Sequence, residues 1–207
     1  MTTPGQRRLG IGGHHAPHHG AKDEWLTPPE LVASLGPFDL DPCSPIDRPW
    51  PTAAHHLTLD DDGLTADWTP YGIVWCNPPY GPDTWQWLDR VAAHPPGGIC
   101  LVFARTETVG FVRSVWRTAS ALLFIAGRLH FHHVTGERAH ANSGAPSVLV
   151  GYGAVAEERL SRAVVDATVA GTFVNRWNAT AGTSRAANAD PFPVPRASLR
   201  PRKPEIS

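Results

Sequence analysis

The apolar residues of this chain fall into short runs that are separated by proline, glycine and polar residues. Runs of four or five residues that end at such turn residues are typical of buried strands. Four of them predict strands at 38–41, 73–76, 99–103 and 121–125. Two further runs, 128–133 and 147–152, lie around a glycine-containing loop and predict a C-terminal antiparallel hairpin.

Apolar residues at helical spacing lie between these runs. They predict helices from the prolines at 28–29 to Gly36, from Asp83 or Thr84 to about 94, around 111–116 and over 157–170. The segment 42–66 has little pattern and is expected to be a long loop. Strands that alternate with helices predict an α/β fold, a mostly parallel sheet with helices on both faces. Such sheets bind ligands beyond the carboxyl ends of their strands.

The two ends of the chain differ in composition from its centre. Residues 1–22 are rich in glycine and histidine and predict a disordered leader. Its histidines could bind metal, but no carboxylate or cysteine joins them, so we favour a plain leader. Residues 178–207 are rich in proline and arginine and predict a flexible basic tail. This tail could contact phosphates, or it could be a solvated end without function. The folded domain is expected at 23–177.

Composition narrows the class of protein. The chain has 207 residues, of which 42% are hydrophobic and 18% are charged, and its net charge is -1. It has no apolar run near the ~20 residues that span a bilayer and no signal-peptide core, so we expect no membrane partner. Its three cysteines form no paired motif, which favours a reducing, cytoplasmic location.

The tetrapeptide Asn77-Pro78-Pro79-Tyr80 directly follows a predicted strand. An exocyclic amino group on a base is a poor nucleophile, because its lone pair is delocalised into the ring. Two acceptors that hold its N–H bonds can turn that lone pair toward an electrophile. The Asn77 side-chain oxygen and the Pro78 carbonyl can be these acceptors, and stacking of Tyr80 on the base is worth about 1–3 kcal/mol. The alternative is a proline-rich turn that only ends a strand.

Three other polar clusters accompany the tetrapeptide. Thr27 precedes two prolines and can cap a helix, offering its hydroxyl and free N–H groups to a carboxylate. Asp41 ends a predicted strand, where it can bind the ammonium or hydroxyl groups of a small cofactor, or else its own turn. One acid of the run 60–62 can accept from the amino group of an adenine ring. A divalent-cation loop is the weaker alternative, because the spacing does not match an EF-hand.

Seven segments in unbroken order resemble the phage-type family of DNA adenine-N6 methyltransferases. They are Asp-Glu-Trp-x-Thr-Pro at 23–28, Leu-Asp-Pro-Cys at 40–43, Asp-Gly-Leu at 62–64, Trp-Cys-Asn-Pro-Pro-Tyr at 75–80, and the segments 103–108, 127–131 and 142–150. The resemblance covers residues 23–152, and the motif at 75–80 is its most specific part.

This resemblance implies a Rossmann-like methyltransferase fold, S-adenosylmethionine as the methyl donor and adenine in double-stranded DNA as the acceptor. The implied catalytic residues, which hold and stack on a flipped adenine, are Asn77, Pro78, Pro79 and Tyr80. The implied cofactor-binding residues are Trp25, Thr27, Pro28, Asp41, Pro42 and Asp62. No metal and no obligate protein partner are expected.

Other features leave alternatives open. Arg105 and Arg128 are expected to contact DNA phosphate or base edges, or else to be surface arginines, and the segment 128–143 is the candidate DNA-contacting loop. The usual Gly-x-Gly turn is absent, and Cys43-Ser44-Pro45 stands in its place, so the cofactor must be held differently. A methyltransferase acting on RNA or on a protein glutamine, and a non-catalytic DNA-binding module, are the alternative functions.

Overall fold

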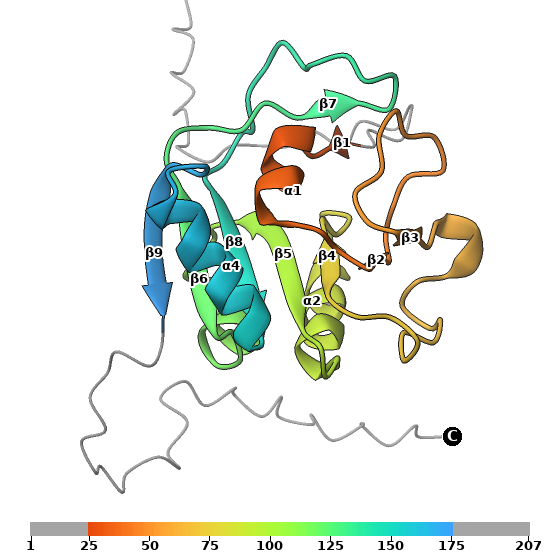
Figure 1. Ribbon diagram of the computed structural model, residues 1–207, viewed down its shortest axis with the longest axis horizontal. Helices are drawn as coiled ribbons and strands as arrows, with labels where there is room; N and C mark the ends of the chain where they lie inside the picture. Colours follow the sequence, from red (N-terminus) through yellow and green to blue (C-terminus); the bar gives the residue numbers. More distant parts are fainter. Residues whose placement is uncertain (1–24, 176–207) are drawn as a thin grey trace, which may run out of the picture. The chain divides into compact units, whose positions relative to one another are not determined.

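A computed structural model describes residues 25–175 (Figure 1). The predicted leader at 1–22 and tail at 178–207 lie outside these residues. Within them, a seven-stranded sheet has the order β3-β2-β4-β5-β8-β6-β9, and a two-stranded sheet joins β1 to β7. In this part of the chain, no helix is both long enough and apolar enough to span a membrane.

Parallel pairing builds one half of the large sheet. Its strands are β2 (Leu40–Asp41), β3 (His55–His56), β4 (Val74–Cys76) and β5 (Gly98–Phe103). Each neighbouring pair among them is parallel. The chain runs from β2 to β3 on one side and then to β4 on the other side of β2. The strand order therefore reverses between β2 and β4, which is where ligands bind in such sheets.

Antiparallel pairing builds the other half, from β6 (Ala121–Ile125), β8 (Ser147–Tyr152) and β9 (Gly171–Asn175). Strand β8 is antiparallel to both β5 and β6, and β9 is antiparallel to β6. Strand β6 therefore runs in the same direction as β5, and only β8 and β9 run against the others. The prediction of a mixed α/β fold with a mostly parallel sheet is confirmed.

The predicted hairpin between 128–133 and 147–152 is wrong. Strand β7 (His132–His133) pairs with β1 (Trp25–Leu26), with Trp25 opposite His133. Every residue of β8 is buried, as a strand in the interior of a sheet covered on both faces must be. The histidine-rich segment before it is too polar for such a place, so it folds back in a turn at 133–137 instead.

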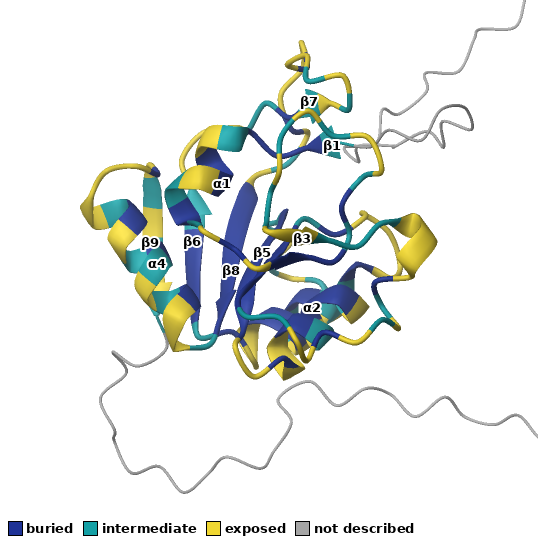
Figure 2. Ribbon diagram, turned by 45° about the vertical axis from the view of Figure 1, so that its right-hand side comes forward, coloured by how far each residue is buried: buried dark blue, intermediate teal, exposed yellow. Residues whose placement is uncertain are grey.

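Helices cover both faces of the large sheet, as predicted. Helices α1 (Pro29–Leu35) and α4 (Ala154–Val165) pack on one face. Helix α2 (Thr84–Ala93) packs on the other with α3 (Val109–Phe111), which continues into the π-helical turn η2 (Val112–Trp116). Figure 2 shows the central strands β5 and β8 buried between these layers.

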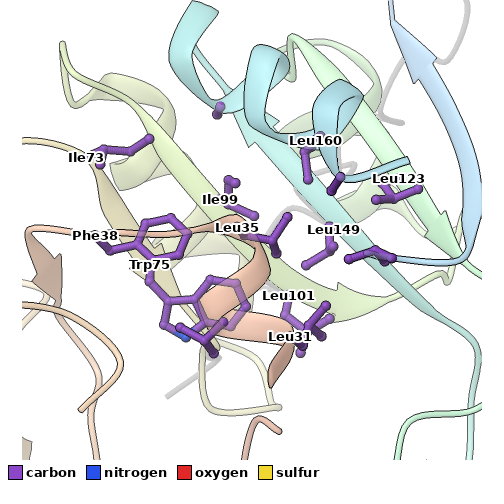
Figure 3. Close-up of a cluster of buried hydrophobic side chains, with 14 of the residues drawn as sticks. Leu31, Leu35, Phe38, Ile73, Trp75, Ile99, Leu101, Leu123, Leu149 and Leu160 are labelled. Carbon is purple, nitrogen blue, oxygen red and sulfur yellow. The ribbon is translucent and has the colours of Figure 1, made fainter. Parts of the chain in front are cut away.

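Successive buried side chains of a strand point to opposite faces of the sheet, as a strand period of two requires. Trp75 and Leu101 point to the side of α1 and α4, where Figure 3 shows them among the leucines of that cluster. Val74 and Val102 point to the side of α2. Each such side chain contributes about 1.5–3 kcal/mol by leaving water. This rigid support carries the strand ends that form the site.

Two other predictions needed correction. The segment 42–66 is not only loop, because it contains β3 and a 3-10 turn, η1 (Leu59–Asp61). The last helix begins at Ala154 and ends at Val165, and Gly171 starts β9 instead of ending the helix. Ala167 takes a positive φ of 54° and closes the turn that follows α4. Strand β9 lies at an edge and alternates partly buried with exposed residues, a weaker signal than a fully apolar run.

Candidate active site

A cavity of about 490 Å³ opens at the carboxyl ends of β2 and β4, at the point where the strand order reverses. Its size suits a small ligand or cofactor. Nine predicted site residues line it, namely Trp25, Thr27, Asp41, Pro42, Asp62, Asn77, Pro78, Pro79 and Tyr80. The structure thus brings together segments that lie far apart in the sequence.

Asn77 presents an unpaired acceptor in this cavity. Its Nδ2 donates a hydrogen bond of 3.2 Å to the backbone carbonyl of Trp25. A carbonyl oxygen can only accept, so the amide must turn its NH₂ group to Trp25 and its oxygen away from it. The buried Asn77 Oδ1 atom has no hydrogen-bond partner among the described residues. A buried amide oxygen without a partner is costly, so this atom suits a ligand that donates a hydrogen bond.

The rest of the tetrapeptide is held by α2. The Thr84 hydroxyl donates to the Pro79 carbonyl at 2.8 Å and accepts from the Gly81 N–H at 2.9 Å. The Pro78 carbonyl, in contrast, accepts no hydrogen bond from the described part of the chain. Two free acceptors, one from Asn77 and one from Pro78, therefore stand in consecutive residues.

Tyr80 is 41% exposed, and its ring stacks on that of Phe103, with ring centroids 4.3 Å apart and planes 12° apart. Phe103 is the last residue of β5, so the stack joins the ends of two neighbouring strands. Phe103 covers one face of the Tyr80 ring, and Tyr80 also lines the cavity.

Thr27 lies at the cavity without capping the helix. The N-cap residue of α1 is Pro28, whose carbonyl accepts from the N–H groups of Leu31 and Val32. Thr27 stands one residue earlier, so the predicted cap by its side chain is wrong. Its Oγ1 is buried and has no hydrogen-bond partner in the part of the chain that the structure describes. Pro28 itself is buried and does not line the cavity.

Asp41 is the buried carboxylate of the site, with 4% of its surface exposed. It accepts hydrogen bonds from the Thr52 hydroxyl and from the Cys43 N–H, the latter at 3.2 Å. Burial raises the pKa of Asp41 from 3.8 to about 6, and the hydrogen bonds from Thr52 and Cys43 oppose that rise. The carboxylate is therefore charged at neutral pH and is held in one orientation.

The sequence carried no signal for Thr52, which lies in the segment without a pattern. Its position depends on His56, whose Nε2 accepts from the N–H groups of Thr52 and Ala53 at 3.1 and 3.3 Å. Burial lowers the pKa of His56 to about 4, so the ring stays neutral and can accept.

Gly63 was also missed as a site residue, although it belongs to the segment 62–64. A Cβ atom at Gly63 would lie 1.9 Å from the Pro42 carbonyl oxygen. Asp62, just before it, takes a positive φ of 46° and lies at the rim of the cavity. The close backbone approach that a Gly-x-Gly turn would provide is thus made here between two distant segments. Asp60 and Asp61 are exposed, and Asp61 accepts from the Thr58 N–H instead.

Three free thiols lie beneath the tetrapeptide, those of Cys43, Cys76 and Cys100. The Cys43 and Cys76 sulfurs are 3.7 Å apart, and Cys43 also donates to the Asn77 carbonyl at 3.4 Å. The hydrogen bond with Cys76, together with burial, raises the pKa of Cys43 well above its usual range. Burial does the same for the pKa of Cys76. The raised pKa values of Cys43 and Cys76 disfavour the thiolate form, which is the nucleophilic form of cysteine.

The two predicted DNA-binding arginines lie outside this cavity. Arg105 follows β5 and lines a second cavity of about 520 Å³. Arg128 follows β6 in an exposed loop and lines neither cavity. Because β5 and β6 run in the same direction, both arginines follow carboxyl ends at the same edge of the sheet.

Comparisons with known proteins identify one family. The model of one family, described as DNA N-6-adenine-methyltransferase (Dam), matches residues 15–171, which is more than half of the chain. No curated protein and no solved structure matches the chain. The family match spans every residue of the cavity, and this chain belongs to the DNA N-6-adenine-methyltransferase (Dam) family.

Proposed function

We propose that this protein transfers a methyl group from S-adenosylmethionine to the N6 amino group of adenine in double-stranded DNA. The observation that carries the proposal is the free, buried Oδ1 of Asn77, which its bond to Trp25 turns away from that carbonyl. An oxygen so placed can accept a hydrogen bond from an exocyclic amino group. Membership of a DNA adenine methyltransferase family supports the same reaction.

The cavity fits the cofactor by its size and by its donor set. S-adenosylmethionine, when bound, supplies an electrophilic methyl group. Asp41 would bind hydroxyl or ammonium groups, and the unpaired Thr27 hydroxyl would complete a polar end of the site. Trp75 and Trp87, which reach the cavity from opposite faces of the sheet, would pack on flat or apolar parts.

Asn77 and Pro78 would activate the substrate by orientation. Both N–H bonds of the amino group would be held, one by Asn77 Oδ1 and the other by the Pro78 carbonyl. The nitrogen lone pair would then be turned out of the plane of the base, where it can react with an electrophile. Alignment of this kind supplies much of the rate of a transfer reaction. The proposed transfer needs no cysteine nucleophile, and the pKa values of the Cys43 and Cys76 thiols are raised well above their usual range.

The adenine must leave the duplex to reach these atoms, as enzymes acting on a base require. The free face of Tyr80 would stack on the flipped base. Arg105 and Arg128 would contact the phosphates on either side. The strand order, with parallel β3, β2, β4 and β5 and the antiparallel β8 between β5 and β6, supports a Rossmann-like methyltransferase fold.

Transfer of a labelled methyl group to duplex DNA, RNA and protein, measured side by side, tests this proposal. We expect label in duplex DNA alone. Label only in RNA or only in protein would show that the substrate is that molecule and not DNA. A titration with S-adenosylmethionine that shows no binding would instead favour a non-catalytic DNA-binding module.

A further inference from the structure

The second cavity, of about 520 Å³, adjoins the tetrapeptide. Apart from Tyr80, only its Arg105 takes part in the proposed function. This cavity lies at the carboxyl end of β5, between the first residues of α2 and the start of α3. Tyr80 lines both this cavity and the first one, so the two cavities adjoin at this residue. Phe103, which covers one face of Tyr80, lines only the second cavity. An occupant of the second cavity would thus be separated from the target adenine by the Tyr80–Phe103 stack.

The walls of this cavity suit a flat, uncharged group. Three of them are the aromatic side chains of Trp85, Phe103 and Tyr80, with Val102 beside them. The hydroxyls of the two threonines in the lining are already engaged. That of Thr84 bonds to the tetrapeptide, as described above, and that of Thr108 donates to the Arg105 carbonyl and accepts from the Phe111 N–H. Recognition here would therefore rest on stacking, which tolerates any base.

One cation stands in the lining. The Arg105 side chain is exposed and makes no hydrogen bond or ion pair with the residues that the structure describes. A free guanidinium next to an aromatic cavity matches the two parts of a nucleotide, with the phosphate at the cation and the base against the rings.

We propose that this cavity holds a second base of the DNA substrate, a neighbour of the target adenine on the same strand. The base packs against Trp85 and Phe103, and Arg105 binds its phosphate. This inference rests on the proposed function, because it requires that the protein acts on DNA. It adds a second nucleotide site, on the far side of Tyr80 from the target.

Paired changes in protein and DNA test the contact with the base. Once modified-base sequencing has located the target adenine, duplexes are made with a single abasic site at each neighbouring position. At one position the abasic site should lower kcat/KM of the unchanged protein about tenfold or more. In Trp85→Leu, the same abasic site should cause no further decrease in kcat/KM. Trp116→Leu is the matched control, because Trp116 is a partly exposed tryptophan that lines neither cavity.

Equal losses in the unchanged protein and in Trp85→Leu would overturn the inference. So would an abasic series with no sensitive position. A Trp85→Leu protein that binds S-adenosylmethionine normally but methylates nothing would place the target base in this cavity, and would also overturn it. Absence of DNA methylation by the unchanged protein is a separate outcome, which defeats the proposed function itself.

A second test combines a substitution of Arg105 with a change in the DNA backbone. Arg105 is exposed, so Arg105→Ala should fold normally. A neutral methylphosphonate at the phosphate of the sensitive position should weaken DNA binding by the unchanged protein, with no further effect in Arg105→Ala. Additive effects of the methylphosphonate and the substitution would contradict the assignment of Arg105.

Discussion

The side-chain amide of Asn77 donates a hydrogen bond to the backbone carbonyl of Trp25, and this bond determines which amide atom is left for a ligand. Trp25 belongs to β1, which pairs with β7 in the candidate DNA-contacting loop, and its ring lies 4.8 Å from that of His133. The orientation of the Asn77 amide therefore depends on a sheet that reaches into that loop.

Asn77→Asp tests this relationship with a side chain of the same size. The aspartate cannot donate to the Trp25 carbonyl, and its second oxygen would face that carbonyl unfavourably. We expect kcat for methyl transfer to fall about 100-fold or more, the effect of losing one oriented polar contact at a reacting group. Affinity for S-adenosylmethionine, measured by calorimetry, should change little.

Gln86→Ala is the matched control for Asn77→Asp, since it changes an exposed amide on α2. It should leave kcat unchanged. An Asn77→Asp protein that retains full activity would show that the bond to Trp25 does not orient the reacting group.

Much of this site could be predicted from the sequence, because it depends on local patterns. An apolar run followed by Asn77-Pro78-Pro79-Tyr80 identifies a strand end, and strand ends of parallel sheets meet at one edge. Thr52 and Gly63 could not be predicted in the same way. Their roles arise from contacts with Asp41 and Pro42, residues that lie in other segments. The pairing of β7 with β1 is likewise a contact across more than 100 residues, which periodicity cannot reveal.

If Asp41 binds the cofactor, as proposed, cofactor binding should depend on pH. Because its pKa is raised from 3.8 to about 6, the carboxylate is charged above about pH 6 and protonated below it. The Kd for S-adenosylmethionine should be flat above that pH and rise as the pH falls below it, by up to about tenfold per pH unit. Calorimetry at a series of pH values would measure this. Asp41→Asn should bind weakly and without this dependence.

Two controls separate binding from unfolding in that series. The lowered pKa of His56 favours the unfolded state as the pH falls below 6.5, so thermal melts are needed at each pH. In Thr52→Val, loss of the hydrogen bond that lowers the pKa of Asp41 should move the midpoint above pH 6. A midpoint that moves down, or an Asp41→Asn protein with the same profile, would contradict the role of this carboxylate.

Gly63→Ala should damage the cofactor cavity. The added methyl group would meet the Pro42 backbone at 1.9 Å, so the two segments must move apart. We expect a loss of about 1–3 kcal/mol in the free energy of unfolding and weaker binding of S-adenosylmethionine. Urea unfolding and calorimetry measure the two effects. Gly144→Ala, where no atom lies within 4 Å of the new methyl group, should leave both unchanged. Normal cofactor binding by Gly63→Ala would show that the close approach of Gly63 to Pro42 does not shape the cofactor site.

Arg128→Ala tests the second expected DNA contact. If Arg128 binds a phosphate, the substitution should weaken DNA binding uniformly across sequences and reduce the slope of log K against log salt by about one. Fluorescence anisotropy at several salt concentrations measures this. Arg162→Ala removes an exposed arginine of α4 and should keep the slope of the unchanged protein. An unchanged slope in Arg128→Ala would show that this residue only lies at the surface.

The most direct test of the central claim is the identity of the methylated nucleoside. Duplex DNA treated with the protein and labelled S-adenosylmethionine would be digested to nucleosides and examined by mass spectrometry. We predict N6-methyl-2′-deoxyadenosine as the labelled product, and none with Asn77→Ala although that variant still binds the cofactor. Labelled deoxycytidine, unlabelled DNA, or undiminished N6-methyl-2′-deoxyadenosine from Asn77→Ala would contradict the account.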